Sequence, residues 1–291
     1  MAGKTQDPSA GVATPAPRAL GALLLALALA LAGAAAAEVA TPVPDGHPGV
    51  AAAYAVAVDG DLLQGGALDL RRQPASLSKL LAALVLLESG WDPEAQVTVS
   101  AAAAAVEGSR IGLRRGERLR AGDLLTGMLV RSGNDACLAL VEHAAGTRTA
   151  FAARMNRRAA ALGMGGSHFV HPCGLDAPGQ HTTARDLLRL AEAARAEPQI
   201  KRRAGMTSAT IRTEAGRKLD FDNSNALIGR APEATGLKSG YTSGAGRCVI
   251  ALAERSGHYA LVVLLGATSD RWWDATGMLA EALGPVAPPR D

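Results

Sequence analysis

Ser76 and Lys79 are the two residues whose types and spacing best suit nucleophilic chemistry. They stand three positions apart in the segment Ser76-Leu77-Ser78-Lys79, and residues three apart on a helix face the same side. A hydroxyl is a weak nucleophile until a base removes its proton, and an amine serves as that base only when its pKa is lowered. Only five of the 30 basic residues are lysine, and arginine cannot be that base. We therefore expect Ser76 to be a nucleophile with Lys79 as its base, rather than a helix cap with a surface lysine.

The residues after Lys79 indicate which element positions this pair. An apolar run continues to Glu88 and covers more than one stripe of a helix, which is typical of a buried helix. Ser89-Gly90 would end it, since glycine readily takes the left-handed conformation that follows many helices. Because about ten residues are too few to cross a bilayer, we expect a core helix with Ser76 in its first turn.

Two further polar motifs stand later in the chain. Ser132-Gly133-Asn134 comes directly before a segment with helical periodicity, and Lys238-Ser239-Gly240 lies within a predicted strand. A second ammonium group near Lys79 would lower the pKa of Lys79, because like charges repel. We expect Lys238 to be that cation rather than an ordinary strand lysine.

Apolar runs bounded by turns predict strands at both ends of the chain, while helical periodicity fills the middle. The predicted strands of the main sheet are Val50 to Val58, Leu62 to Leu70, Gly236 to Thr242, Arg247 to Ala253 and Tyr259 to Leu265. Thr207 to Arg212 is predicted as an edge strand and Trp272 to Leu283 as a closing helix. These elements predict an α/β (α+β) fold, in which one antiparallel sheet is flanked by helices and an all-helical region is inserted between its strands.

Length and composition indicate one large domain. The chain has 291 residues, of which 48% are hydrophobic and only 3% aromatic, so alanine, leucine and valine must form most of the core. We expect a catalytic domain over residues 50–284, a linker over 38–49 and a tail over 285–291. The net charge is +3 and basic residues occur only in short pairs such as Arg114-Arg115, which excludes a nucleic-acid footprint.

The first 37 residues have the pattern of a signal peptide. Lys4 and Arg18 precede the alanine- and leucine-rich run Ala19 to Ala32, and small residues precede Glu38. This pattern predicts an exported protein, periplasmic or otherwise outside the cytoplasm. The alternative is an uncleaved anchor, since Ala19 to Ala37 is just long enough to cross a membrane. Membrane contact is expected only in that case.

The cysteines, histidines and tryptophans leave narrower choices. Cys137, Cys173 and Cys248 allow one disulfide with one free thiol, or three buried thiols, and the sequence does not choose. His168, His171 and His181 lack the helical spacing of zinc ligands, so we expect neither a metal nor a cofactor. The Trp272-Trp273 pair is expected to pack in the protein rather than to bind a saccharide.

The ordered set of three motifs resembles the low-molecular-weight penicillin-binding proteins. These are the serine D-Ala-D-Ala carboxypeptidases, with related D,D-endopeptidases, which trim the bacterial cell wall. The resemblance runs from about Ala51 to Leu283 and includes flanking segments such as Phe169 to Leu175 and Gly240-Tyr241-Thr242. It implies a penicillin-recognising serine transpeptidase-like fold. Two features depart from the family pattern: Ser239 stands where threonine is usual, and the C-terminal β-domain of many relatives is missing.

The resemblance also implies roles for individual residues. Ser132 would pass a proton to the leaving amine, and Asn134 would hold the substrate backbone. The backbone N–H groups of Ser76 and Tyr241 would form the oxyanion hole. The groups expected to bind the substrate's terminal carboxylate are Lys238, Ser239, Thr242 and Arg271.

The implied activity is removal of the terminal D-alanine from peptidoglycan stem pentapeptides through an acyl-enzyme on Ser76. β-Lactam antibiotics are expected as covalent inhibitors. One alternative is a D,D-endopeptidase that cleaves cross-links, and another is a non-catalytic module that binds cell wall or penicillin. A class A β-lactamase is disfavoured, because no Glu-x-x-Leu-Asn segment stands between Asn134 and Lys238.

Overall fold

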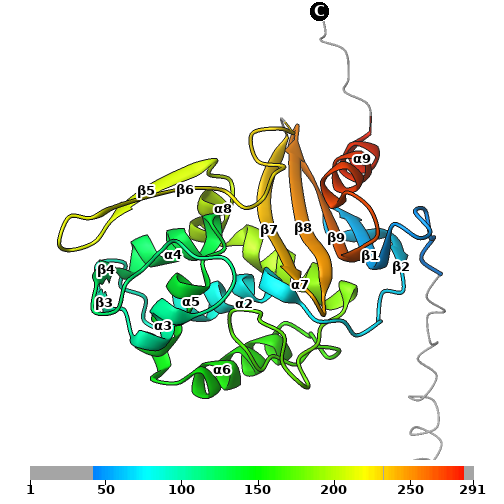
Figure 1. The fold of residues 1–291 in the computed structure, drawn as a ribbon. Helices are drawn as coiled ribbons and strands as arrows, with labels where there is room; N and C mark the ends of the chain where they lie inside the picture. Colours follow the sequence, from blue (N-terminus) through cyan, green and yellow to red (C-terminus); the bar gives the residue numbers. More distant parts are fainter. Residues whose placement is uncertain (1–41, 232, 285–291) are drawn as a thin grey trace, which may run out of the picture. The chain divides into compact units, whose positions relative to one another are not determined.

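A five-stranded antiparallel sheet joins the two ends of the domain (Figure 1). The computed structural model describes residues 42–231 and 233–284. The strands lie in the order β2-β1-β9-β8-β7, so that β1 pairs with β9 although they stand at opposite ends of the sequence. Their bounds are β1 (Ala51–Val58), β2 (Asp61–Gly66), β7 (Ala234–Thr242), β8 (Gly246–Arg255) and β9 (His258–Ala267).

A helical region is inserted between β2 and β7. It comprises the 3₁₀ turn η1 (Ala75–Leu77) and the helices α2 (Ser78–Leu87), α3 (Ala101–Ala105), α4 (Ala121–Val130), α5 (Asn134–Ala145), α6 (Arg148–Ala161), α7 (Ala184–Ala196) and α8 (Pro198–Ala204). The last helix, α9 (Arg271–Leu283), follows β9. This arrangement confirms the predicted α/β (α+β) class, the single antiparallel sheet and the inserted helical region.

The main sheet is buried on both faces, as the alternation along its strands requires. In β1, Ala53, Ala55 and Ala57 face the large core formed with the inserted helices. The intervening Tyr54 and Val56 belong to a second core, which α9 closes. Figure 1 shows α9 on one side of the sheet and α7 and α2 on the other. The sheet is therefore a central layer from which β7 can be presented to the inserted helices.

Helix α2 is a core helix, as predicted. Every residue from Ser78 to Leu86 is buried, including the polar Ser78 and Lys79. The helix begins two residues later than expected, because Ser76 lies in the 3₁₀ turn η1. Since a 3₁₀ turn has about three residues per turn, Ser76 and Lys79 still lie on the same side.

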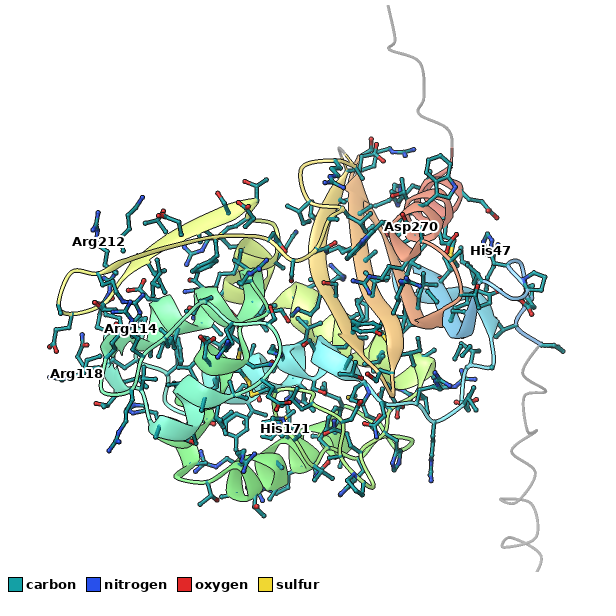
Figure 2. All side chains as sticks on the ribbon, in the orientation of Figure 1. His47, Arg114, Arg118, His171, Arg212 and Asp270 are labelled. Atoms are coloured by element: carbon teal, nitrogen blue, oxygen red, sulfur yellow. A yellow bond between two sulfur atoms is a disulfide. The ribbon has the colours of Figure 1, made fainter. Side chains whose placement is uncertain are left out.

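Two short ribbons extend from the inserted region. Strand β3 (Gln96–Thr98) pairs with β4 (Arg118–Arg120), and β5 (Ser208–Arg212) pairs with β6 (Lys218–Asp222). The predicted edge strand over Thr207 to Arg212 is confirmed, since the segment is a strand with one neighbour; that neighbour, β6, was not predicted. Figure 2 labels Arg114, Arg118 and Arg212 at the end of the domain that carries these ribbons.

The ends of the domain add three observations. Residues 44–49, expected as part of a linker, contact the sheet, since Gly65 N–H donates to the Pro44 carbonyl and His47 N–H to the Tyr54 hydroxyl.

Trp273 is 81% exposed, so the expectation that it packs in the protein was wrong. The predicted signal peptide or anchor and the predicted tail lie outside the described residues. Among the described helices, none is long and apolar enough to span a membrane.

Candidate active site

The amine of Lys79 lies next to the hydroxyl of Ser76. Lys79 Nζ is 2.8 Å from Ser76 Oγ, across the junction of η1 and α2. The turn is sharp, since Ala75 has a φ of +49°, in the left-handed region that few residues other than glycine adopt. Strained backbone of this kind is concentrated at functional sites. The structure thus brings the predicted nucleophile and base into hydrogen-bonding contact.

Two other oxygens complete the surroundings of the Lys79 amine. Nζ donates to Asn134 Oδ1 at 2.7 Å and to the Cys173 carbonyl at 2.6 Å. Both oxygens are carbonyl oxygens and can only accept hydrogen bonds. The orientation of the Asn134 amide is fixed, because its nitrogen donates to the Glu107 carbonyl at 2.6 Å. A neutral amine has two N–H groups and one lone pair. With both N–H groups directed to these acceptors, the lone pair faces Ser76 Oγ, which is the arrangement that a general base requires.

Burial and charge both favour the neutral amine of Lys79. The side chain is fully buried, and burial, with the Lys238 ammonium as the next cause, lowers the pKa of Lys79 well below its usual value. The buried Asp135 carboxylate acts in the opposite direction. Burial, together with the Arg271 guanidinium, also lowers the pKa of Lys238, to about 7. The two lysines are therefore buried and electrostatically coupled.

Asn134 is held at the start of α5 by a structured loop. Its backbone N–H donates to the Ser109 carbonyl at 2.7 Å. The next residue, Asp135, accepts hydrogen bonds from the backbone N–H groups of Ile111, Gly112, Leu113 and Ala136. A carboxylate with several backbone donors is well compensated for its burial. Asp135 therefore fastens the 108–113 loop to α5, a role that the sequence analysis did not identify.

Ser132 connects α4 to α5 beside Asn134. It is only 5% exposed and has a φ of +63°, the left-handed conformation that is uncommon for residues with a side chain. Gly133 follows it, and its N–H bonds to the Gly127 carbonyl in α4. The motif Ser132-Gly133-Asn134 is therefore a tight connection between two buried helices.

Strand β7 passes directly against the nucleophile. A Cβ atom on Gly240 would lie 2.8 Å from the backbone nitrogen of Ser76 and 2.8 Å from Ala75 Cβ, so only glycine fits at that position. The residue that follows, Tyr241, is 65% exposed. The backbone of β7 at Gly240 and Tyr241 is thus brought to the edge of the Ser76 turn.

Four predicted carboxylate-binding residues lie in or beside β7, and each has a partner in the protein. Lys238 Nζ donates to the Ser239 carbonyl at 2.8 Å, and Ser239 Oγ donates to the Ser224 carbonyl at 3.1 Å. Thr242 Oγ1 donates to Asp176 Oδ1 at 2.6 Å, which uses the only proton of that hydroxyl. Arg271 Nη1 donates to the Gly240 carbonyl at 3.1 Å. The role predicted for Thr242 therefore requires its bond to Asp176 to break.

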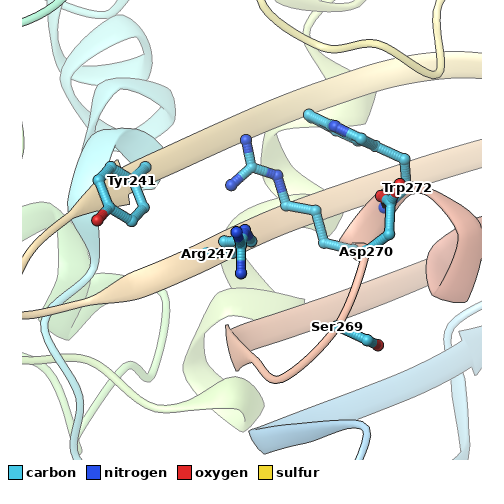
Figure 3. Close-up of a pocket in the computed structure, with 6 residues that line it drawn as sticks. Tyr241, Arg247, Ser269, Asp270 and Trp272 are labelled. Atoms are coloured by element: carbon cyan, nitrogen blue, oxygen red, sulfur yellow. Dashed lines mark hydrogen bonds between the residues drawn. The ribbon is translucent and has the colours of Figure 1, made fainter.

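A hollow of about 680 Å³ opens beside the end of β7 (Figure 3). It is lined by Tyr241, Arg247, Ser269, Asp270, Arg271 and Trp272. The guanidinium of Arg271 lies 4.3 Å from the centre of the Trp272 ring. Two guanidinium groups and one carboxylate leave this hollow with an excess of positive charge.

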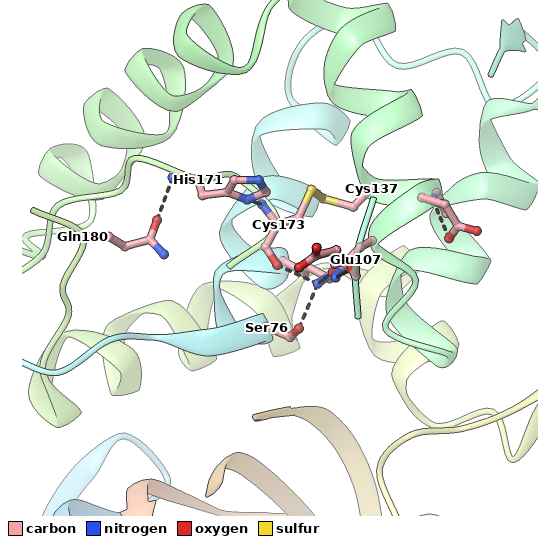
Figure 4. Close-up of a disulfide and its surroundings, with 10 residues drawn as sticks. Ser76, Glu107, Cys137, His171, Cys173 and Gln180 are labelled. Carbon is pink, nitrogen blue, oxygen red and sulfur yellow. Dashed lines mark hydrogen bonds between the residues drawn. A yellow bond between two sulfur atoms is a disulfide. The ribbon is translucent and has the colours of Figure 1, made fainter. Parts of the chain in front are cut away.

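The cysteines form one bridge and one thiol. Cys137 of α5 is bonded to Cys173, and Cys248 is a buried free thiol. Figure 4 shows this disulfide beside Ser76 and Glu107, with His171 and Gln180 on the same loop as Cys173. His171 Nδ1 accepts from the Cys173 N–H at 3.3 Å, and burial lowers the pKa of His171 to about 4. In the part of the chain that the structure describes, no group of three or more potential ligands could hold a metal ion.

A family model described as D-alanyl-D-alanine carboxypeptidase matches residues 40–269. The chain belongs to this family. Among its relatives, DacB2 of Mycobacterium tuberculosis is 33% identical over 255 residues, which cover 84% of this chain and 86% of DacB2. DacD of Escherichia coli is 36% identical over 225 residues, covering 73% of this chain and 56% of DacD. The chain thus spans about half the length of some D-alanyl-D-alanine carboxypeptidases and most of others.

Solved structures show the same fold. The Streptomyces K15 DD-transpeptidase superposes with a TM-score of 0.75 at 27% identity, over 80% of this chain and 97% of that one. The D-alanyl-D-alanine carboxypeptidase of Mycobacterium tuberculosis gives a TM-score of 0.75 at 32% identity, over 83% of this chain and 92% of that one. These similarities confirm the predicted family and the predicted penicillin-recognising serine transpeptidase-like fold.

Proposed function

We propose that this chain is a serine D-Ala-D-Ala carboxypeptidase that removes the terminal D-alanine from peptidoglycan stem pentapeptides. The observation that carries the proposal is the position of Lys79 Nζ, which lies 2.8 Å from Ser76 Oγ, 2.7 Å from Asn134 Oδ1 and 2.6 Å from the Cys173 carbonyl. This geometry equips Ser76 for attack on a carbonyl carbon. The family relationship supplies the substrate class.

The reaction proceeds in two steps. Lys79 takes the proton of Ser76 as Oγ attacks the carbonyl of the penultimate D-alanine, and the N–H groups of Ser76 and Tyr241 hold the developing oxyanion. Ser132 gives its proton to the amine of the leaving D-alanine and receives from Lys79 the proton taken from Ser76. The D-alanine then departs, an ester remains on Ser76, and Lys79 is neutral again. Water then hydrolyses the ester, with Lys79 again as the base. Lys238 and Ser239 hold the terminal carboxylate, for which the Ser239 hydroxyl must leave the Ser224 carbonyl, and Arg271 orders β7 through the Gly240 carbonyl.

A β-lactam carries a strained amide in place of the scissile bond and is expected to acylate the same serine. No metal or cofactor is required by any of these steps. The natural partners are the stem peptides of the cell wall, which lie outside the cytoplasm. The Cys137–Cys173 disulfide supports export, since such bonds persist in oxidising compartments.

One observation favours a second candidate, a D,D-endopeptidase that cuts cross-links between stems. The hollow beside Tyr241 has a volume of about 680 Å³, within the range of pockets that hold whole drug-sized ligands. A single alanine needs much less room. The guanidinium groups of Arg247 and Arg271 would suit a leaving group with an additional carboxylate.

Incubation of the purified protein with a free pentapeptide and with a cross-linked dimer tests the proposal. Release of D-alanine from the pentapeptide, abolished in Ser76→Ala, is the expected result. Monomer released only from the dimer would establish the endopeptidase instead. A protein that binds cell wall equally well with and without Ser76, and releases nothing from either substrate, would be a binding module and would refute both.

A further inference from the structure

The Cys137–Cys173 disulfide joins the two segments that supply the acceptors of the Lys79 amine. Asn134 and Cys137 lie three residues apart in α5, on the same side of the helix. Cys173 itself carries the carbonyl that accepts the other N–H. The bridge closes a sequence separation of 36 residues and brings the two Cα atoms to 5.9 Å. One covalent bond therefore joins the two segments that carry Asn134 Oδ1 and the Cys173 carbonyl.

Other hydrogen bonds shape the Cys173 loop but do not attach it to α5. Gln180 Oε1 accepts from the N–H groups of Val170 and His171, and Gln180 Nε2 donates to the Leu175 carbonyl. Asn156 of α6 exchanges two hydrogen bonds with the backbone of Phe169. Among the hydrogen bonds of residues 42–231, none connects residues 168–176 directly to α5. The disulfide is thus the direct tie between these two segments.

We propose that the Cys137–Cys173 disulfide is a positioning device for the general base, which holds the Cys173 carbonyl in place relative to Asn134 so that the lone pair of Lys79 is directed at Ser76. The inference rests on the proposed function, because it assumes that Ser76 is acylated. When the bridge is reduced, the Cys173 carbonyl is free to move relative to Asn134, which its bonds to Glu107 and Ser109 still hold, and the Lys79 amine loses one fixed acceptor. Misplacement of a catalytic group by about 1 Å can cost 100-fold in rate. Full activity therefore requires an oxidising compartment.

A disulfide also stabilises a fold, so the test must separate positioning from stability. Loss of a native bridge lowers the free energy of unfolding. That loss lowers the melting temperature without changing the rate constant of the molecules that remain folded. Positioning of Lys79 predicts a slower chemical step with unchanged substrate binding, because the carboxylate site around Lys238 belongs to β7.

The experiment measures acylation of the full protein by a fluorescent penicillin with stopped-flow mixing, well below the melting temperature. The noncovalent dissociation constant and the acylation rate constant are obtained separately for wild type, Cys137→Ala, Cys173→Ala and the control Cys248→Ala, which removes the buried thiol of β8. We expect both bridge variants to lose tenfold or more in the acylation rate constant with a dissociation constant within twofold of wild type. The control should match wild type.

Reversible reduction supplies the second measurement, since it needs no variant to fold from the start. Wild type treated with dithiothreitol should lose the same factor in rate with an unchanged circular dichroism spectrum, and reoxidation should restore it. An unchanged rate constant in either bridge variant would overturn the inference while leaving the proposed function intact. A parallel loss of binding and rate would assign the bridge a purely structural role. Failure of wild type itself to react with penicillin would overturn both.

Discussion

The side-chain oxygen of Asn134 accepts a hydrogen bond of 2.7 Å from the amine of Lys79. The same amide donates to the Glu107 carbonyl, so one N–H remains for a substrate carbonyl. The sequence analysis assigned Asn134 only to the substrate backbone. The structure places it against the base as well, and this double position gives the first prediction.

Replacement of Asn134 by aspartate should raise the pKa of Lys79. The new carboxylate would lie beside the amine and favour its protonated form. The acidic limb of the pH profile for acylation should move upward by one pH unit or more, and the rate at pH 7 should fall at least tenfold. Asn134→Ala, which removes the bond without adding charge, should slow the reaction but shift the limb less. Identical limbs in wild type and Asn134→Asp would contradict this role.

Gly240→Ala should disrupt the contact between β7 and the Ser76 turn. The added methyl group would lie 2.8 Å from the Ser76 nitrogen, so the strand must move, at a cost of about 1–3 kcal/mol in unfolding free energy. Acylation should fall by more than tenfold, because the oxyanion site shares this backbone.

Gly277→Ala provides the matched control for that substitution. Gly277 lies inside α9, and a Cβ there meets no atom within 4 Å. Alanine should stabilise the helix by roughly 0.5–1 kcal/mol and leave acylation unchanged. Equal rates for Gly240→Ala and Gly277→Ala, measured together with urea denaturation, would show that β7 does not need to approach Ser76.

The low pKa of Lys238 should make stability depend on pH. Its pKa is about 7 in the folded protein, below the ordinary value of 10.5, so between these values the unfolded chain binds more protons. The free energy of unfolding should therefore rise with pH from about 7 towards 10.5, by up to about 1.4 kcal/mol per pH unit from this group. Urea denaturation at pH 7.5, 8.5 and 9.5 measures the slope.

Lys238→Met removes one titrating group and should reduce that rise, to which the low pKa of Lys79 also contributes. Lys218→Met, at an exposed position of β6, should run parallel to wild type. A Lys238→Met curve with the wild-type slope would mean that Lys238 is not held in a site that disfavours its charge.

Much of this site follows from local sequence, because helix geometry alone brings Ser76 and Lys79 together. The apolar run after Lys79 also predicts burial, and burial lowers the pKa of an amine. The main sheet was predictable as well, since β1, β8 and β9 are continuous apolar runs bounded by turns, as expected of strands that are buried on both faces. The spacing between the three motifs, by contrast, indicates a family and not a geometry.

The features that the sequence did not predict depend on contacts between distant segments. Three cysteines leave the pairing open, and only the fold places Cys137 next to Cys173. Side-chain types cannot identify the Cys173 backbone carbonyl, although it accepts a hydrogen bond from Lys79. From the sequence, Asp135 has the position of an ordinary carboxylate in the first turn of a helix. Only the structure shows that the backbone of the 108–113 loop donates hydrogen bonds to it. Strand β6 could have been found from the buried Leu219 and Phe221, which alternate with exposed residues.

The most direct test of the account is the rate at which a penicillin acylates Ser76 when Lys79 is replaced by arginine. Arginine is also long and basic, but it stays protonated and cannot accept the Ser76 proton. Intact-protein mass spectrometry over time, with peptide mapping of the adduct, measures this rate. We predict one adduct per chain, on Ser76, formed at least 100-fold more slowly in Lys79→Arg than in wild type. An adduct on another residue, or equal rates in the two proteins, would contradict the central claim that Lys79 is the base for Ser76.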